Sequence, residues 1–360
     1  MKVCVIGNNL TGLVLAKALV NKEIFVDIIY RDKKINNDKT RTIGISKTNI
    51  DYFNKYISNI SRISWPIKKI KIYSENSGNQ EIIGFEDQKN NLFSIVKNEQ
   101  IFNKLYLDLK KSKFSNFKKD TGYKNLIKSG YDLLVNCDFK HELTKKFFFK
   151  KLEKKYNSIA FTTIVYHKKL KNNNTAYQVF THKGPMAFLP ISGQKTSIVY
   201  SIRTKKLESE PDLESLIKKF NLNYKIKKID KISKFSLISS NLRQYYLNNI
   251  LAFGDLLHKL HPLAGQGFNM SIRDIKKLIE IINDKIELGL PLDKNVCIEF
   301  QNATKSKNLI FSEGIDFIYE SFNSEDKLKS NLVDKTVRIV GKNKFINRYF
   351  TKVADTGFNL

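Results

Sequence analysis

The chain has 360 residues, enough for about two domains at roughly 150 residues each. Hydrophobic residues make up 41% of it and include 25 Phe and 16 Tyr, which excludes a wholly disordered protein. The 63 basic and 35 acidic residues leave a net charge of +28, a balance found in proteins that bind nucleic acid or anionic membranes. Lysine is spread along the chain and no nucleic-acid motif occurs. We therefore expect no nucleic-acid partner and interpret most of the excess charge as compositional drift.

The cysteines are few and widely separated, which predicts neither a disulfide framework nor a metal site. They are Cys4, Cys137 and Cys297. Every apolar run is interrupted well before about 18 residues, so we expect no transmembrane helix. The first residues favour a strand that runs into a helix over a signal peptide. Together these features predict a cytoplasmic protein without a bound metal.

The first residues predict a βαβ unit. Lys2–Ile6 is a short apolar strand, residues 7–12 form a glycine-bearing turn into an amphipathic helix, and Phe25–Tyr30 is a second strand. Residues 98–111 carry apolar side chains at helical spacing, and residues 131–136 are typical of a buried strand. This half of the chain favours a parallel α/β domain.

From residue 157 to residue 203 the hydrophobic period changes to two. The pattern predicts an antiparallel sheet with turns at 172–174, 182–184 and 192–194. A further strand at 251–253 is followed by helical spacing over 267–282 and from 296 onward. We predict an α/β fold: a Rossmann-like domain with a parallel sheet, interrupted by an antiparallel-sheet domain and followed by a helical C-terminus.

The turn after the first strand partly matches the dinucleotide fingerprint G-x-G-x-x-G. Gly7, Asn9 and Gly12 occupy the three glycine positions, and asparagine tolerates a left-handed backbone better than most residues. The acidic residue expected at the end of the second strand is replaced by Tyr30. By itself the motif leaves a nucleotide site and a purely structural turn equally open.

A second segment, residues 251–274, is more specific. A strand ends at Gly254 and Asp255, a loop contains Pro262, and glycines around Gln266 open a long helix. The free N–H groups and positive dipole end of such a helix can face an anion, and the Asp255 carboxylate can accept hydrogen bonds from sugar-like hydroxyls. The segment therefore predicts a binding site for an anionic, hydroxyl-bearing cofactor.

This segment resembles the G-D-x-x-H-x-x-x-P-x-x-G-Q-G-x-N motif of the FAD-dependent aromatic hydroxylases, and within them the ubiquinone-biosynthesis hydroxylase family. The resemblance implies that Asp255 binds the ribityl chain of FAD and that the helix beginning near Gly267 faces the N1–C2 edge of the isoalloxazine. Residues 41–46 look like the family's R-x-x-x-L-S segment, whose arginine, here Arg41, contacts the cofactor. The cofactor-binding residues so implied are Gly7, Asn9, Gly12, Arg41, Gly254, Asp255, Pro262, Gly265, Gln266, Gly267 and Asn269.

Two strands, at 175–180 and 184–190, resemble the substrate-domain strands of the quinone-pathway members. Strand alternation puts some of their aromatic residues toward the flavin, and Phe180 and Phe188 are the candidates for stacking on an aromatic substrate. The chain departs from the family at Asn9, at Tyr30, and at Phe139, which replaces the glycine of a central D-G motif after Asp138.

The resemblance implies a discontinuous FAD-binding domain (1–60, 95–150 and 245–290), a substrate domain (61–94 and 151–244) and a C-terminal helical region (291–360). It implies an FAD-dependent monooxygenase that hydroxylates the ring of a polyprenylated phenol or quinone precursor, in ubiquinone biosynthesis, through reaction of reduced FAD with O2 to a C4a-hydroperoxide. An external donor, NAD(P)H or a reductase or ferredoxin, would reduce the flavin. No side chain is assigned as catalytic.

Two alternatives stay open. One is another FAD oxidoreductase, such as an isoprenoid reductase; the other is a degenerate, non-catalytic paralogue that acts as a lipid-binding scaffold. Residues 328–353 carry an apolar stripe flanked by Lys335, Arg338 and Lys342. Packing against the rest of the protein explains the stripe, and so does peripheral contact with the inner face of a membrane or with a biosynthetic complex, which a hydrophobic polyprenyl-phenol substrate would favour.

Overall fold

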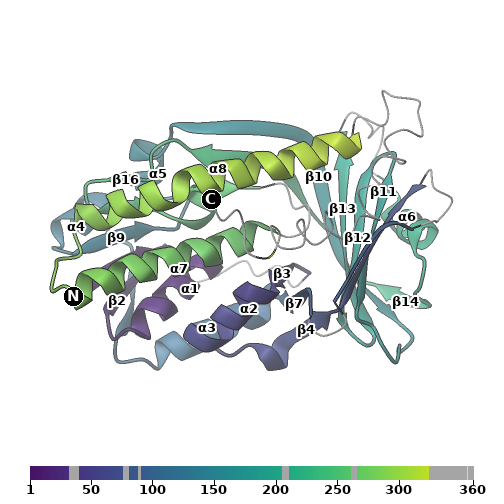
Figure 1. Ribbon diagram of the computed structural model, residues 1–360, viewed down its shortest axis with the longest axis horizontal. Helices are drawn as coiled ribbons and strands as arrows, with labels where there is room; N and C mark the ends of the chain where they lie inside the picture. Colours follow the sequence, from purple (N-terminus) through teal and green to yellow (C-terminus); the bar gives the residue numbers. More distant parts are fainter. Residues whose placement is uncertain are drawn as a thin grey trace.

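A computed structural model describes residues 1–31, 40–75, 81–87, 91–204, 211–260, 266–323 and 355. Within these ranges the strands form a six-stranded, a nine-stranded and a three-stranded sheet. Figure 1 shows the six-stranded sheet and its helices at one end of the molecule and the nine-stranded sheet at the other. The predicted fold class is confirmed, a parallel α/β unit combined with antiparallel sheets and long C-terminal helices.

The six-stranded sheet is parallel except at one edge. Its order is β16-β17-β9-β1-β2-β8, and only β16 runs antiparallel to its neighbour. In that order the strands are Tyr246–Leu247, Ile250–Ala252, Leu133–Asn136, Lys2–Ile6, Phe25–Tyr30 and Ser115–Lys119. The chain leaves β1 toward β2 and later returns to β9 on the other side of β1. The crevice between the carboxyl ends of β1 and β9 is therefore the switch point at which open α/β sheets bind ligands.

Helices cover this sheet because its central strands are apolar on both faces. Val3, Cys4 and Val5 are all fully buried. The covering helices include α1 (Leu10–Val20), α3 (Asn98–Lys110) and α7 (Gln266–Glu287), and α1 packs against the other two. The shorter helices α4 (Tyr123–Lys128) and α5 (Glu142–Phe147) flank β9 in the sequence. One hydrophobic core joins these helices to the sheet.

The nine-stranded sheet is built mainly from consecutive antiparallel strands. Its order is β18-β15-β10-β13-β12-β11-β5-β6, with β14 also paired to β10. In chain order the strands are β5 (Lys69–Ser74), β6 (Glu81–Glu86), β10 (Lys151–His167), β11 (Thr175–Thr181), β12 (Gly184–Ser192), β13 (Lys195–Arg203), β14 (Ile226–Ile229), β15 (Ser233–Leu242) and β18 (His258–Lys259). Helix α6 (Leu213–Phe220) packs on one core of this sheet and α8 (Lys294–Asn323) on another.

A small sheet joins the two large ones. Its order is β3-β7-β4, formed by Thr42–Ser46, Phe93–Lys97 and Ser64–Ile67. Helix α2 (Lys47–Tyr56) follows β3 directly, and α7 packs against both. Thr42 Oγ1 donates to Ser197 Oγ on β13 at 2.9 Å, which ties the small sheet to the nine-stranded one. The small sheet thus fixes where the two larger units meet.

Three findings qualify the sequence predictions. Strand β8 was not predicted, and β10 begins at Lys151 instead of residue 157, with a register shift between Lys155 and Ile159. The apolar stripe at 328–353 lies outside the described residues. The division into domains remains a proposal.

Among the described residues, no helix has the length and apolar character to cross a membrane.

Candidate functional site

The turn between β1 and α1 requires glycine at two of the three fingerprint positions. Gly7 has φ +105°, a conformation that strains any residue with a side chain. A Cβ on Gly12 would lie 2.2 Å from the carbonyl oxygen of Gly7, so only glycine lets α1 start this close to β1. The first and third glycines therefore keep the tight-turn and helix-packing roles of a dinucleotide fold.

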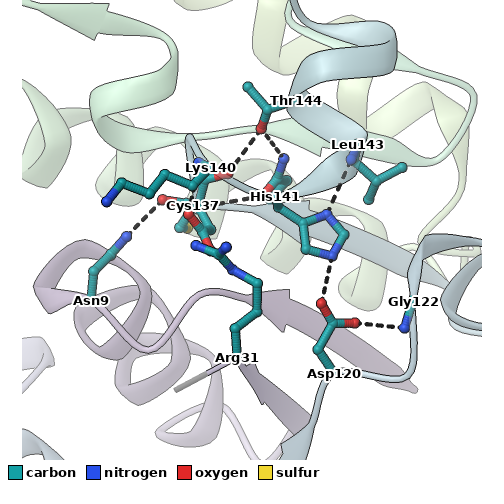
Figure 2. Close-up of polar contacts among 11 residues, drawn as sticks. Asn9, Arg31, Asp120, Gly122, Cys137, Lys140, His141, Leu143 and Thr144 are labelled. Carbon is teal, nitrogen blue, oxygen red and sulfur yellow. Dashed lines mark hydrogen bonds and ion pairs between the residues drawn. The ribbon is translucent and has the colours of Figure 1, made fainter. Parts of the chain in front are cut away.

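Asn9, at the middle position, acts through its side chain. Its backbone is extended (φ −76°, ψ 173°), so the left-handed tolerance considered from the sequence is not used. The Oδ1 atom accepts a hydrogen bond from the Gly12 N–H at 2.9 Å and caps α1, while Nδ2 donates to the carbonyl oxygen of Cys137 at 2.7 Å (Figure 2). Asn9 thus ties the start of α1 to the end of β9.

Tyr30 ends β2 where an acidic residue would bind a ribose hydroxyl, and the basic residue Arg31 follows it. Arg31 Nε lies 2.7 Å from Asp138 Oδ2, and the two side chains form a partly exposed ion pair. Asp138 Oδ1 also accepts from the Lys140 N–H at 2.8 Å. Phe139, which replaces a family glycine, is 59% exposed and points away from the core. Asp138 and Phe139 stand in a recognisable motif of the sequence, whereas Arg31 does not.

Asp27, the acidic residue near Tyr30, has a structural role. Its Oδ2 atom accepts hydrogen bonds from Lys118 Nζ at 2.9 Å and from the Tyr131 hydroxyl at 2.7 Å, and Lys2 Nζ lies 3.2 Å away. Burial alone would raise the pKa of this carboxyl, but hydrogen bonds from Lys118, Tyr131 and Lys2 outweigh burial and lower it. Asp27 therefore connects β2 with its neighbouring strands, and its carboxylate is occupied by groups of the protein.

A buried histidine completes the polar contacts at this edge of the sheet. His141 Nδ1 accepts from the Leu143 N–H at 3.2 Å, and its Nε2 lies 3.1 Å from Asp120 Oδ2 (Figure 2). Because Nδ1 accepts, the ring proton is on Nε2 in this arrangement. Asp120 in turn accepts from the Gly122 N–H at 2.8 Å. These contacts fix the loops that follow β8 and β9.

The Gly254–Asp255 motif follows β17 and meets the start of α1. Gly254 has φ +67°, and a Cβ there would lie 2.7 Å from Thr11 Cγ2. Asp255 is exposed. Burial raises the pKa of the Cys137 thiol, and the nearby carboxylates of Asp138 and Asp255 raise it further. The two aspartates thus flank the ends of β9 and β17, while the backbone of Gly254 lies against the first turn of α1.

The N-terminus of α7 has an open space beside Gln266 and Gly267, which we call the cradle. No atom of the described residues lies within 4 Å of the position a Cβ would take on Gly267. Gln266 is 6% exposed, and its Oε1 atom is buried without a hydrogen-bond partner among the described residues. Pro262 and Gly265, both predicted to bind the cofactor, lie outside the described residues. The helix end therefore has room for a ligand and a buried amide still able to bond to one.

The Asn269 side chain forms hydrogen bonds with other residues of the protein. Its Oδ1 accepts from the Ser46 N–H at 2.8 Å and from Asn49 Nδ2 at 3.0 Å, and its Nδ2 donates to the Gly44 carbonyl at 2.8 Å. These bonds hold α7 to β3 and α2. Arg41, just before β3, is exposed, and its carbonyl accepts from the Asn98 N–H at 3.1 Å. Asn269 and Arg41 thus bracket the β3 segment beside the α7 terminus.

A buried network stands behind the Gly254–Asp255 motif. His258 Nε2 lies 2.6 Å from Asp274 Oδ2, and Asn308 Nδ2 donates to Asp274 Oδ1 at 3.0 Å. His258 and Asp274 are 1% and 2% exposed. Since the three residues come from β18, α7 and α8, the network fixes the loop after β17 relative to the α7 terminus.

The two predicted substrate residues lie in different cores. Phe180 belongs to a cluster with Leu260, Met270 and Phe311, next to the α7 terminus. Phe188 is 1% exposed and stacks on Tyr177 at 4.3 Å between ring centroids, in the cluster covered by α6. The structure therefore places Phe180 beside the candidate site and Phe188 in a packed core away from it.

The flavin fit differs between the two ends of the site. At the α7 end, the open space at Gly267, the unpartnered Gln266 oxygen and the exposed Asp255 carboxylate suit the polar edge of an isoalloxazine and a ribityl chain. At the β1 end, the turn keeps its two structural glycines, but Asn9 and the Arg31–Asp138 pair already use the crevice. The residues fit the flavin end, whereas at the β1 end Asn9, Arg31 and Asp138 are bonded to other groups of the protein.

Comparison with known proteins bears on the family and on the fold. Residues 136–287 match the family model described as FAD binding domain. The chain is 28% identical over 159 residues to 3-demethoxyubiquinol 3-hydroxylase of Escherichia coli, covering 42% of this chain and 40% of that protein. It is 27% identical over 188 residues to the mitochondrial ubiquinone biosynthesis monooxygenase COQ6 of Dictyostelium discoideum, covering 42% and 38%. The matches thus span about two fifths of the length of these relatives.

Solved structures match almost the whole fold. The p-nitrophenol 4-monooxygenase PnpA of Pseudomonas putida has a TM-score of 0.78 at 13% identity, covering 97% of this chain and 96% of its own. HpxO of Klebsiella pneumoniae, solved with FAD and uric acid, has a TM-score of 0.75 at 13% identity, covering 99% and 97%. The resemblance predicted from the sequence is confirmed, by the domain match and the curated relatives for the family and by these structures for the fold.

Proposed function

With an FAD binding domain over residues 136–287 and the fold of the FAD-dependent monooxygenases, we propose that this chain is an FAD-dependent monooxygenase. Its proposed substrate is a polyprenylated phenol or related quinone precursor, and its proposed reaction adds one oxygen atom of O2 to the aromatic ring. The curated relatives named for ubiquinone biosynthesis support this substrate class. An external electron donor is part of the proposal.

The observation that carries the proposal is the geometry around Gly254, Gln266 and Gly267. Gly254 lets the end of β17 reach the start of α1, while Gly267 leaves space, among the described residues, at the N-terminus of α7. The α7 N–H groups and helix dipole favour negative charge at that point. A reduced flavin is anionic at its N1–C2 edge, so this helix end would stabilise the reduced form.

The flavin, when bound, would supply the redox chemistry with O2. This chain's residues would bind, orient and shield it. Asp255 would accept hydrogen bonds from ribityl hydroxyls, and Gln266 would bond to the polar edge of the ring. Asn269, through its bonds to Gly44 and Ser46, would keep β3 at a fixed distance from the α7 terminus.

The substrate side of the site is apolar. The cluster containing Phe180, Leu260 and Met270 lies where α7 meets the nine-stranded sheet, and it also includes Phe311 from α8. Such a surface excludes water and suits an aromatic ring with a hydrocarbon tail. Phe180 is the residue we propose for contact with the substrate ring.

Purified protein reconstituted with FAD tests the cofactor and the reaction together. We expect a bound flavin spectrum and, with a chemical reductant, O2 and a polyprenyl phenol, a product heavier by one oxygen atom. Asp255→Ala should weaken FAD binding about tenfold, because a charged hydrogen-bond acceptor to the ribityl chain is lost. Phe139→Ala, on an exposed side chain of the same sheet edge, is the matched control and should bind FAD as the wild type does.

The alternatives are separated by the same preparation. Protein that stays colourless with FAD at high concentration would contradict the cofactor assignment and favour the scaffold role. A bound flavin with an O2-independent, chain-reduced product would favour an isoprenoid reductase. Loss of one particular ring-hydroxylated intermediate on deletion of the gene would identify the ring position.

A further inference from the structure

The Arg31–Asp138 ion pair crosses the crevice that a dinucleotide would enter. Arg31 follows β2 and Asp138 closely follows β9, and these strands flank β1 on its two sides. Neighbouring strands are about 4.8 Å apart, so a contact between residues beyond β2 and β9 spans about 10 Å over the end of β1. The pair therefore lies over the Gly7 turn, at the switch point of the sheet.

The space under the pair is also narrow. A Cβ on Gly7 would lie 3.1 Å from Asp138 Cβ and 3.2 Å from Asp138 N. Next to it, Asn9 Nδ2 holds the Cys137 carbonyl at 2.7 Å while Asn9 Oδ1 takes the Gly12 N–H. Cys137 and Asn9 are thus tied together. Because Asn9 occupies the Gly12 N–H, the first turn of α1 has one fewer free N–H that could bind a phosphate.

Charge adds to the closure. The Asp138 carboxylate faces the Gly7 turn at the switch point, so a pyrophosphate in this crevice would meet a group of the same negative charge. Arg31 would attract a phosphate, but its Nε is engaged by Asp138 at 2.7 Å. An adenylate half that entered this crevice would have to break the pair, separate the side chains and meet the partly buried Asp138 carboxylate. The flavin end, at α7, involves none of these contacts.

We propose that the Arg31–Asp138 pair is a closure over the adenylate half of the cofactor crevice, which makes this chain discriminate poorly between FAD and flavin mononucleotide. The inference rests on the proposed flavin function. It predicts that the flavin end supplies most of the binding free energy. It also predicts that breaking the closure strengthens the binding of FAD alone, because flavin mononucleotide has no adenylate to place in the crevice.

The test measures dissociation constants of FAD and flavin mononucleotide for the full-length apoprotein by quenching of flavin fluorescence. In the wild type, the two constants should lie within about threefold of each other. Asp138→Asn keeps an oxygen for the Lys140 N–H but removes the charge, and it should raise FAD affinity about fivefold, the scale of one partly exposed ion pair. Affinity for flavin mononucleotide should stay unchanged.

Two further variants keep the result interpretable. Arg31→Ala removes the covering side chain and should also shift the preference toward FAD; a shift away from FAD would show that Arg31 binds the cofactor and would overturn the closure. Glu142→Gln removes an exposed carboxylate in the first turn of α5, four residues after Asp138, without touching the pair. It is the matched control and should leave the ratio of the two constants unchanged.

The outcomes separate the closure from the proposed function. If neither flavin binds the wild type or the variants, the proposed function fails. If both flavins bind and the ratio is the same in the wild type, Asp138→Asn and Arg31→Ala, the function stands and the closure is wrong. A wild type that binds FAD at least tenfold more tightly than flavin mononucleotide also contradicts the closure. Because affinity for flavin mononucleotide reports a folded site, a misfolded variant is recognised at once.

Discussion

At the scale of single residues, the glycines of the site divide according to what surrounds them. Gly12 and Gly254 lie against other atoms, since an added Cβ would come within 2.2 Å of the Gly7 carbonyl oxygen and 2.7 Å of Thr11 Cγ2. An added Cβ on Gly267, at the start of α7, would have no atom of the described residues within 4 Å. Gly12 and Gly254 are therefore needed for the packing of the fold, whereas no described atom fills the space beside Gly267.

Gly267→Ala therefore separates stability from binding. Alanine is favoured over glycine inside a helix, so the free energy of unfolding should rise by about 0.5–1 kcal/mol. The added methyl group would fill the cradle at the α7 terminus, and affinity for FAD and for flavin mononucleotide should fall together. Chemical denaturation and flavin titration of the same preparation measure both effects.

Gly12→Ala is the contrasting variant. It forces α1 away from β1 and should lower the free energy of unfolding by more than about 2 kcal/mol. A Gly267→Ala protein that lost stability but kept its flavin affinity would contradict the assignment of the cradle.

At the scale of secondary-structure elements, Asp27 joins strands that are far apart in the sequence. Its partners are Lys2 on β1, Lys118 on β8 and Tyr131 just before β9, while Asp27 itself is on β2. Four neighbouring elements of the parallel sheet thus share one carboxylate. Loss of its charge would leave two lysines and a tyrosine hydroxyl without their common acceptor.

This arrangement predicts a pH-dependent stability. The pKa of Asp27 is lowered below its ordinary value of 3.8 in the folded protein. The carboxylate therefore stabilises the fold above about pH 4, and this contribution is lost as the pH falls through the lowered folded pKa. Asp27→Asn should cost about 1–3 kcal/mol of unfolding free energy at pH 7, with a smaller difference from the wild type near pH 3.

Urea denaturation of both proteins across this pH range is the measurement. Asp284→Asn, on an exposed carboxylate near the end of α7, is the control and should change stability little at either pH. A cost for Asp27→Asn that stayed constant from pH 7 to pH 3 would show that packing, not charge, explains the role of Asp27.

Elements with local signals were predictable, and contacts between distant residues were not. β1, α1 and β2 follow from apolar runs and two glycines within 30 residues, and α7 follows from helical spacing after a glycine-rich loop. β8 was missed because its sequence, SNFKK, has one buried residue and two lysines, and only its pairing with β2 makes it a strand.

The same limit applies to the site. Gly7, Gly254 and Asp255 stand in short motifs and could be named from the sequence. Arg31 and Asp138 are 107 positions apart, and Asn269 bonds to Ser46 across 223 positions. The one local clue was Tyr30 at the place where an acidic residue was expected, and the basic residue that follows it was not considered. No local pattern gives the partner of such a residue.

At the scale of the whole molecule, the net charge of +28 still calls for a measurement. We predict that the protein binds vesicles containing anionic lipid at about 0.1 M salt and is released as salt is raised, because screening weakens attraction between lysines and the surface. Charge reversal at Lys335, Arg338 and Lys342, which lie outside the described residues, should weaken the binding. Flotation with labelled vesicles measures it.

Equal association with neutral vesicles at low salt would contradict the electrostatic part of this prediction. A control variant reverses the same number of charges at three exposed lysines among the described residues, Lys110, Lys111 and Lys113. If that control loses binding to the same extent, the attraction belongs to the protein's overall charge and not to the C-terminal segment.

The strand order also has a consequence during synthesis. β9 lies between β1 and β17, so the parallel sheet cannot be completed until residue 252 has been added. At about 5–20 residues per second, the apolar edge of β9 waits roughly 6–25 seconds for its neighbour while the long antiparallel strands emerge from the ribosome. An unpaired apolar edge is prone to aggregation. A newly made chain therefore depends on protection by chaperones, or on low concentration, until β17 reaches β9.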